Sequence, residues 1–211
     1  MKQILCFGDS NTYGLIPGTT GRYGWNVRWT GILDEYVRNK GYRVIEEGLC
    51  GRTTIFEDEL REGRRGIDTL PILLESHNPI DIVVLMLGTN DCKAVYNASA
   101  ELIGKGIKRL LEQIKNKIPK SKVVLVSPIL LGEGVWEDGF DKEFNHQSVE
   151  TSKNLHNVYK RIADENEIFY LKASEYASPS EADREHLDEK GHGHLAEALI
   201  DLIKGVINDG Y

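Results

Sequence analysis

The 211-residue sequence has no apolar run long enough to cross a lipid bilayer. Its longest runs, at residues 80–87 and 123–126, fall far short of the roughly 18 residues that a membrane-spanning helix needs. Residues 1–7 hold one lysine and then a strand-like stretch, without the apolar region and cleavage site of a signal peptide. We therefore expect a cytoplasmic protein that does not engage membranes.

Cysteine and long basic blocks are also scarce. The three cysteines are odd in number and show no Cys-x-x-Cys spacing, which indicates reduced thiols rather than a disulfide framework. Lysine and arginine number 26 against 33 aspartates and glutamates, for a net charge of −7. With no basic block that could follow a phosphate backbone, nucleic acid is not an expected partner.

The length indicates one domain, which we place at residues 1–211. A chain of this size can bury about 70% of its unfolded surface, so its core needs no metal or disulfide. The sequence contains no internal repeat, linker or low-complexity tract that would divide it.

Short β-branched runs alternate with amphipathic stretches along the chain. Five buried strands are predicted, at residues 3–7, 42–47, 80–87, 122–127 and 168–171. Helices are predicted at residues 29–39, 66–77, 98–118, 149–166 and 190–208. Residues 130–145, rich in glycine and aromatic side chains, are predicted to form a long surface loop or flap. This alternation predicts an α/β fold, a three-layer α/β/α sandwich around a five-stranded parallel, flavodoxin-like sheet.

Polar and glycine-rich segments follow four of these strands. Open parallel sheets bind ligands at the carboxyl ends of their strands, so these segments are expected to meet. They supply a serine, close-approaching backbone amides, an asparagine and an Asp-x-x-His pair, which are the groups that acyl transfer requires. The segments are residues 8–14 (GDSNTYG), 48–52 (GLCGR), 88–91 (GTND) and 183–186 (DREH).

In this order, GDS, GTND and DxxH resemble the SGNH (GDSL-type) hydrolases, and the resemblance covers nearly the whole chain. The GDS triplet alone is a weak signal, whereas the ordered set at successive strand ends is specific. Residues 27–31, 44–49, 52–54 and 86–91 are similar to the arylesterase/acyltransferase branch. The resemblance implies the SGNH hydrolase fold and a serine esterase that uses no metal or organic cofactor.

The resemblance also implies a role for each matched residue. Ser10 would be the nucleophile, His186 the general base, and Asp183 the carboxylate that orients the imidazole. The backbone N–H groups of Ser10 and Gly51 and the side-chain amide of Asn90 would form the oxyanion hole. The spacing of three residues from Asp183 to His186 allows one tight turn to place the carboxylate against the ring.

Two positions beside the nucleophile depart from the family pattern. Asn11 replaces the leucine of the GDSL signature, and Tyr13 stands where the resembling branch often has tryptophan. Neither change removes a catalytic group, so we expect them to affect substrate range. With Trp25 and Trp136, which could wall an acyl or aryl pocket, Asn11 and Tyr13 are the predicted substrate-binding residues.

The same residues have plainer interpretations. Ser10 could cap a helix, Asn90 could form a turn, and the basic segment 61–65 could be a solvated loop rather than a site for an anionic substrate. The spacing of the C-terminal histidines matches no standard zinc pattern, so no metal is expected (His186, His192 and His194).

The leading hypothesis is a serine esterase that cleaves small carboxylic esters, with a short acyl group such as acetyl, through an acyl-enzyme, with acyltransfer as a side activity. Alternatives on the same machinery are a carbohydrate O-deacetylase and a lysophospholipase or thioesterase. A flavodoxin-like phosphate-binding module lacks any GxGxxG or GxxxxGK[ST] motif to support it. A catalytically inactive interaction protein is a further alternative. The expected partner is a small-molecule ester, and homo-oligomerisation follows from the resemblance only.

Overall fold

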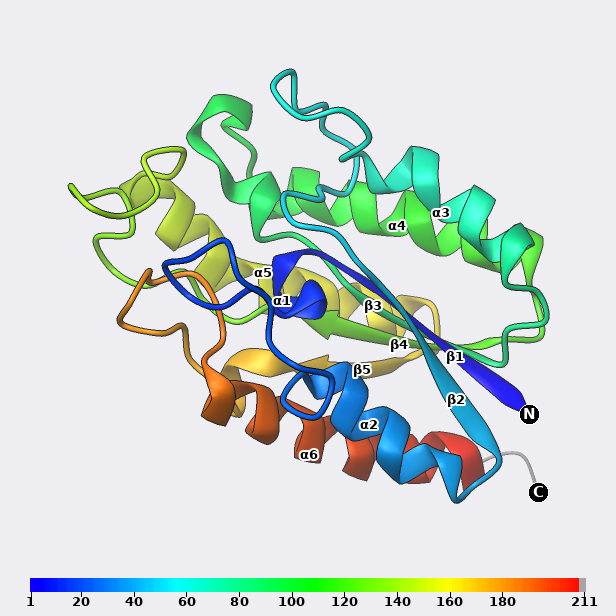
Figure 1. Ribbon diagram of the computed structural model, residues 1–211. Helices are drawn as coiled ribbons and strands as arrows, with labels where there is room; N and C mark the ends of the chain where they lie inside the picture. Colours follow the sequence, from blue (N-terminus) through cyan, green and yellow to red (C-terminus); the bar gives the residue numbers. More distant parts are fainter. Residues whose placement is uncertain (209–211) are drawn as a thin grey trace.

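A parallel sheet forms the centre of the protein in the computed structural model, which describes residues 1–208 (Figure 1). Its five strands within this range lie in the order β2-β1-β3-β4-β5. Their bounds are Lys2–Gly8 (β1), Tyr42–Gly48 (β2), Ile82–Met86 (β3), Lys122–Ser127 (β4) and Phe169–Lys172 (β5). The order places β3 at the centre, between β1 and β4, and this confirms the predicted flavodoxin-like sheet.

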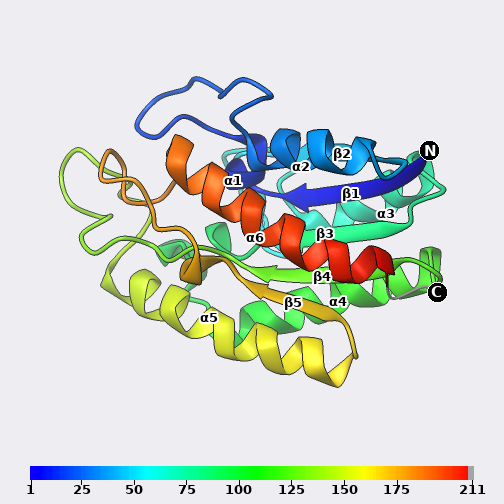
Figure 2. The ribbon, with the colours of Figure 1, turned by 90° about the horizontal axis from the view of Figure 1, so that it is seen from below.

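Helices cover both faces of the sheet (Figures 1 and 2). The helices α2 (Trp29–Arg38) and α6 (Glu189–Asn208) pack on one face. The opposite face carries α3 (Gly66–Ser76), α4 (Ala100–Lys117) and α5 (His146–Glu165). The three-layer sandwich is thus confirmed. Short helices that the sequence did not predict follow the strands, namely α1 (Ser10–Tyr13), η1 (Asn90–Cys92), η2 (Ala94–Tyr96) and η3 (Ala173–Glu175).

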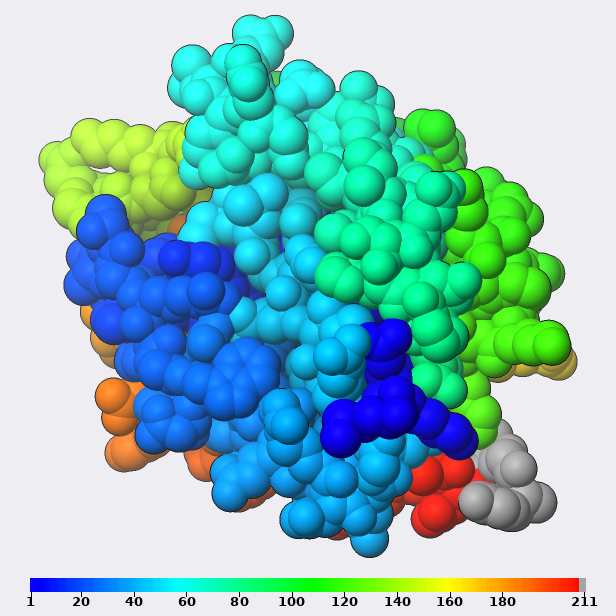
Figure 3. Space-filling view, turned by 45° about the vertical axis from the view of Figure 1, so that its right-hand side comes forward, coloured from blue at the N-terminus to red at the C-terminus, as the bar shows by residue number. Residues whose placement is uncertain are grey.

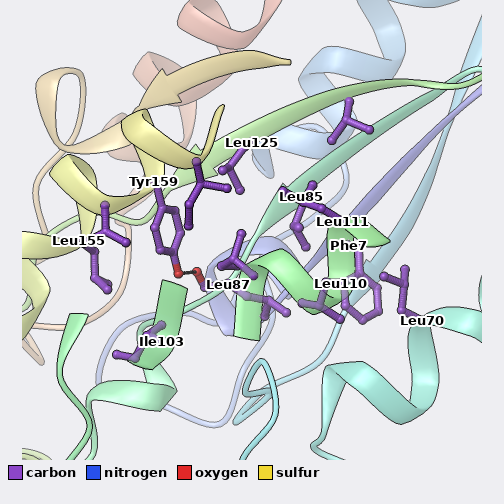
Figure 4. Close-up of a cluster of buried hydrophobic side chains, with 14 of the residues drawn as sticks. Phe7, Leu70, Leu85, Leu87, Ile103, Leu110, Leu111, Leu125, Leu155 and Tyr159 are labelled. Atoms are coloured by element: carbon purple, nitrogen blue, oxygen red, sulfur yellow. Dashed lines mark hydrogen bonds between the residues drawn. The ribbon is translucent and has the colours of Figure 1, made fainter. Parts of the chain in front are cut away.

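Alternate residues of each central strand enter different cores. In β1, Leu5 and Phe7 join the cluster under α3, α4 and α5, whereas Ile4 and Cys6 join the cluster under α2 and α6. Figure 4 shows part of the first cluster. Because both of their faces are buried, the central strands have continuous apolar sequences, and this pattern made them predictable.

Helix α3 contains a proline, and a side chain of α4 replaces the hydrogen bond that the proline cannot make. Pro71 has no N–H to donate to the carbonyl of Ile67, one turn earlier. The side-chain amide of Gln113, on α4, donates to that carbonyl instead (2.8 Å). The helix therefore continues through the proline, and its apolar face stays against the sheet.

Two predictions near residue 145 need correction. Helix α5 begins at His146, three residues before the predicted start, because Asn145 and Ser148 form a capping box. Residues 130–145 contain neither helix nor strand, as predicted, but they are not a free surface loop. Three of their apolar side chains are buried in the core (Leu131, Val135 and Phe144), whereas Glu133, residues 137–139, Lys142 and Asn145 are exposed.

Candidate active site

The connecting segments at the carboxyl ends of the strands gather at one end of the molecule, at the left in Figure 1. Figure 3 shows residues 14–28 (blue), 51–65 (cyan) and 133–145 (yellow-green) crowded together there. The register pairs Gly8 of β1 with Gly48 of β2 and with Met86 of β3. The three segments that follow these strands therefore start side by side.

Ser10 is held against His186, which is 176 residues away in the sequence. Ser10 is the first residue of α1, whose N-cap is the side chain of Asp9, bonded to the N–H of Asn11 (3.0 Å). The Oγ atom of Ser10 lies 2.8 Å from Nε2 of His186, and both residues are buried. The interpretation of Ser10 as a helix cap is therefore wrong, since Asp9 is the cap.

Asp183 holds the other nitrogen of the same ring. Its Oδ2 lies 2.7 Å from Nδ1 of His186 and accepts the N–H of Gly18 (2.9 Å). Its Oδ1 accepts the N–H groups of Glu185 (3.0 Å) and His186 (2.9 Å). Burial alone would raise the pKa of Asp183, but these bonds and the His186 charge lower it to about 2. The carboxylate is therefore ionised at any ordinary pH.

The histidine is surrounded by negative charge. Burial alone would lower the pKa of His186, but the charges of Glu185, Asp183 and Asp9 outweigh it and raise the pKa to about 9. The pKa of Asp9 is itself raised to about 6, mainly by burial. The site therefore favours the imidazolium form that a base acquires when it takes a proton from serine.

The segment after β2 is tied to the nucleophile's strand. The N–H of Leu49 donates to the carbonyl of Gly8 (3.2 Å), and the buried guanidinium of Arg52 donates to the same carbonyl (2.8 Å) and to that of Glu47. Gly51 has φ +82°, a conformation that glycine adopts without strain. This segment places the backbone of Gly51 beside the end of β1.

Asn90 joins the same region from the segment after β3. Its Nδ2 donates to the carbonyl of Arg52 (3.2 Å), and the side chain is buried. This bond uses one of the two N–H groups of the amide and leaves the second for another oxygen. The next residue, Asp91, accepts the N–H and the hydroxyl of Thr54, so both segments are fixed to each other. Asn90 is therefore more than a turn former.

Asn11, predicted to bind substrate, bonds to the backbone around the histidine. Its Oδ1 accepts the N–H of Leu187 (2.9 Å), and its Nδ2 donates to the carbonyl of Glu185 (3.4 Å). These two backbone groups flank His186, and the amide of Asn11 is buried. The asparagine next to the nucleophile therefore holds the backbone on both sides of His186, and its contact with a substrate stays a prediction.

We expect Asn11→Leu, which restores the GDSL signature, to lower kcat/KM rather than raise it. Leucine leaves the buried N–H of Leu187 without its acceptor and frees the backbone around His186. A displaced catalytic group costs up to about 100-fold, so a loss of about 10- to 100-fold is expected with an aryl acetate. Wild-type kcat/KM in a folded Asn11→Leu variant would contradict the positioning role.

The other predicted substrate-binding residues, Tyr13 at the end of α1 and Trp25 and Trp136 in connecting segments, contact neighbouring side chains. Tyr13 stacks under the guanidinium of Arg22, with 4.0 Å from the guanidinium carbon to the ring centroid. Trp25 packs against Arg28 in the same way (4.8 Å). Trp136 meets the ring of His146 edge-on, at 5.8 Å between centroids. Their contact with a substrate stays a prediction.

The basic segment 61–65 is largely neutralised by acidic partners. Arg61 pairs with Asp58 (2.9 Å) and with Glu143 (3.0 Å). Arg65 is close to Glu57 and Asp68 as well. These pairs favour a structural loop over a site for an anionic substrate.

The two later histidines, His192 and His194, differ in burial. His192 is buried and accepts the N–H of Trp29 at Nδ1 (3.4 Å), whereas His194 is exposed. Burial lowers the pKa of His192 to about 4, so its ring is neutral. His192 therefore belongs to the packing of α6 on α2.

Comparisons with known proteins show the family to which this chain belongs. Residues 6–198 match the model of the GDSL-like lipase/acylhydrolase family. Among solved structures, Est24, a carbohydrate acetylesterase from Sinorhizobium meliloti, is 33% identical with a TM-score of 0.89, over 98% of this chain and 100% of that chain. The native aryl esterase of M. smegmatis is 32% identical with a TM-score of 0.89, over 97% and 99% of the two chains. A search of curated proteins found no match.

A chain with this sheet and a serine, histidine and aspartate at its carboxyl edge is a serine hydrolase of the SGNH type. It belongs to the GDSL-like lipase/acylhydrolase family and is a carboxylic-ester hydrolase. Within residues 1–208, no helix combines the length and the apolar character that a bilayer crossing requires.

Proposed function

We propose that this enzyme hydrolyses small carboxylic esters with a short acyl group, such as acetyl, through an acyl-enzyme at Ser10. One observation carries the proposal. A single imidazole, His186, lies 2.8 Å from the serine Oγ through Nε2 and 2.7 Å from the Asp183 carboxylate through Nδ1. A serine alone is a weak nucleophile, and this chain of bonds activates it.

In the first step, Oγ of Ser10 attacks the ester carbonyl while Nε2 of His186 takes its proton. Asp183 stabilises the imidazolium that forms and keeps the ring oriented. The carbonyl oxygen becomes an oxyanion, which the N–H groups of Ser10 and Gly51 and the amide of Asn90 stabilise. Each well-aimed donor is worth roughly 3 kcal/mol of the barrier.

In the second step, the alcohol leaves with the proton from His186, and the acyl group stays on Ser10. Water then enters, gives a proton to His186 and attacks the acyl carbon. The bond between that carbon and Oγ of Ser10 breaks, His186 returns the proton to Oγ, and the acid leaves the enzyme. Another alcohol in place of water would complete an acyltransfer, which we propose as a side activity.

A carbohydrate O-deacetylase is the second candidate. It is supported by the carbohydrate acetylesterase among the similar structures, whereas the aryl esterase supports the first candidate. Both reactions remove a small acyl group and use the same residues, so the alcohol part of the ester distinguishes them.

A panel of esters tests the proposal. We expect kcat/KM to be highest for acetates and to fall as the acyl chain of an aryl ester lengthens from acetate through butyrate to octanoate. Aryl acetate and acetylated sugars, compared by kcat/KM, decide between the two candidates. The absence of hydrolysis of every ester above the Ser10→Ala background would contradict the proposal.

We further propose a single domain over residues 1–211 and a cytoplasmic location, which the free state of Cys6, Cys50 and Cys92 supports. Association into a homo-oligomer through residues 130–145 is a hypothesis that sedimentation of the wild type against a loop deletion tests.

A further inference from the structure

A second carboxyl group lies beside the reacting nitrogen of the histidine. Oε1 of Glu185 is 3.6 Å from Nε2 of His186, the nitrogen that also contacts Ser10. Asp183 lies at Nδ1 on the opposite side of the ring (2.7 Å), so carboxyl groups bracket both nitrogens. Among residues 1–208, His186 is the only basic residue with which the Glu185 carboxyl forms an ion pair.

The backbone fixes Glu185 in this place. Its N–H donates to Oδ1 of Asp183 (3.0 Å), and its carbonyl accepts the amide of Asn11 (3.4 Å). The residue before it, Arg184, has φ +60°, a left-handed conformation that residues other than glycine rarely adopt. Arg184 is held there by bonds of its N–H to Ser180 and of its carbonyl to Gly132, both 2.7 Å.

Burial makes the carboxyl of Glu185 sensitive to its neighbours. Glu185 is 6% exposed, and desolvation raises its pKa to about 7, although the His186 charge acts in the opposite direction. The other acidic groups that face it are Asp141, Asp183 and Asp9, and all of them raise its pKa further. At neutral pH the charge of the Glu185 carboxyl therefore depends on the charge of His186.

We propose that Glu185 is a positioning residue that stabilises the imidazolium of His186 at Nε2 and thereby sets the pH range of the reaction. The proposal rests on the proposed function, because it concerns the same histidine. As the serine proton moves to Nε2, the positive charge forms 3.6 Å from the Glu185 carboxylate and 2.7 Å from that of Asp183. The proton then passes to the leaving alkoxide, and the carboxylate is unchanged at the end.

The same contact has a consequence for the resting enzyme. An ionised Glu185 keeps a proton on His186, and a protonated ring cannot accept the proton of Ser10. The base becomes free only when the pair has lost its proton, so kcat/KM should rise with pH through the neutral and mildly alkaline range.

Glu185→Gln tests the proposal because it keeps the size of the side chain and removes its charge. Since the imidazolium loses a stabilising charge, the pKa of His186 should fall, and the acidic limb of the kcat/KM profile should move to lower pH by about 1 unit or more. The NMR titration of the His186 ring should move in the same direction. This titration needs no turnover, so it separates failure of the inference from failure of the proposed ester hydrolysis.

Two variants complete the experiment. Glu181→Gln removes an exposed carboxyl from the same loop and should leave both curves unchanged. Glu185→Asp keeps the charge near the ring and should retain a limb close to that of the wild type, which also serves if the glutamine variant fails to fold. Superimposable titrations of the wild type and Glu185→Gln would overturn the proposal, and so would an equal shift in Glu185→Asp and Glu185→Gln.

Discussion

We expect Ser10→Ala to lower kcat/KM for an aryl acetate by about 10⁴- to 10⁶-fold, because the variant has no atom that can form the acyl-enzyme. The fold should survive this change. The Oγ of Ser10 bonds to His186, whereas the cap of α1 is the side chain of Asp9, which stays in place. Residual turnover would come from direct attack of water on the ester, with the oxyanion donors still stabilising the negative charge on the carbonyl oxygen. Steady-state kinetics measures the loss, and circular dichroism checks the fold.

Ser178→Ala is the matched control, since this exposed serine lies on the segment that carries the histidine but has no role in the account. It should retain wild-type activity. A purified, folded Ser10→Ala variant within tenfold of the wild type would show that another group is the nucleophile.

The second large effect is expected for Asp183→Asn, with a fall in kcat of about 10⁴-fold. An amide can offer its N–H to Nδ1 of His186 and so favours the tautomer that cannot take the serine proton. Because a negative charge is lost, the pKa of His186 should fall, and the little activity that remains should extend to lower pH. Asp188→Asn is the control and should keep wild-type kcat, since this exposed residue directly precedes α6 and asparagine can still accept the N–H of Gly191.

Asp183 should also contribute to stability in a defined pH window. Its pKa is about 2 in the folded protein against 3.8 as the ordinary value, so its ionised form stabilises the fold above about pH 4. That contribution is lost as the pH falls through 2. The free energy of unfolding of Asp183→Asn should therefore approach that of the wild type in acid.

A kcat of the Asp183→Asn variant above a tenth of the wild-type value would contradict the role of Asp183 in orienting the ring of His186.

The fold was predictable where burial leaves a mark on the sequence. Strands β1 and β3 are buried on both faces and appear as apolar runs, and α4 shows one apolar stripe. The start of α5 was missed because the capping box of Asn145 and Ser148 lies in a segment without apolar periodicity. The burial of Val135 in the 130–145 segment depends on tertiary contacts that no local pattern reveals.

The candidate site was also predictable only in part. Ser10, Asp183 and His186 stand in short motifs at strand ends, so the topology of parallel strands was enough to predict that they meet. The contacts of Asn11 join residues 174 and 176 positions apart in the sequence, and spacing alone could not reveal them. The role proposed for Glu185 depends on the burial of its carboxyl beside Nε2 of His186, which the fold alone determines. Two signals were present, namely a polar residue in place of the signature leucine and an acid next to the catalytic histidine.

The most direct test of a serine-bound intermediate is peptide mass mapping after an acid quench during turnover of an aryl acetate. The account predicts one acetyl group on the peptide that contains Ser10 in the wild type and none on that peptide in Ser10→Ala. Turnover at the wild-type rate with the acetyl group on a different residue, or with no acetylated peptide at any quench time, would contradict it.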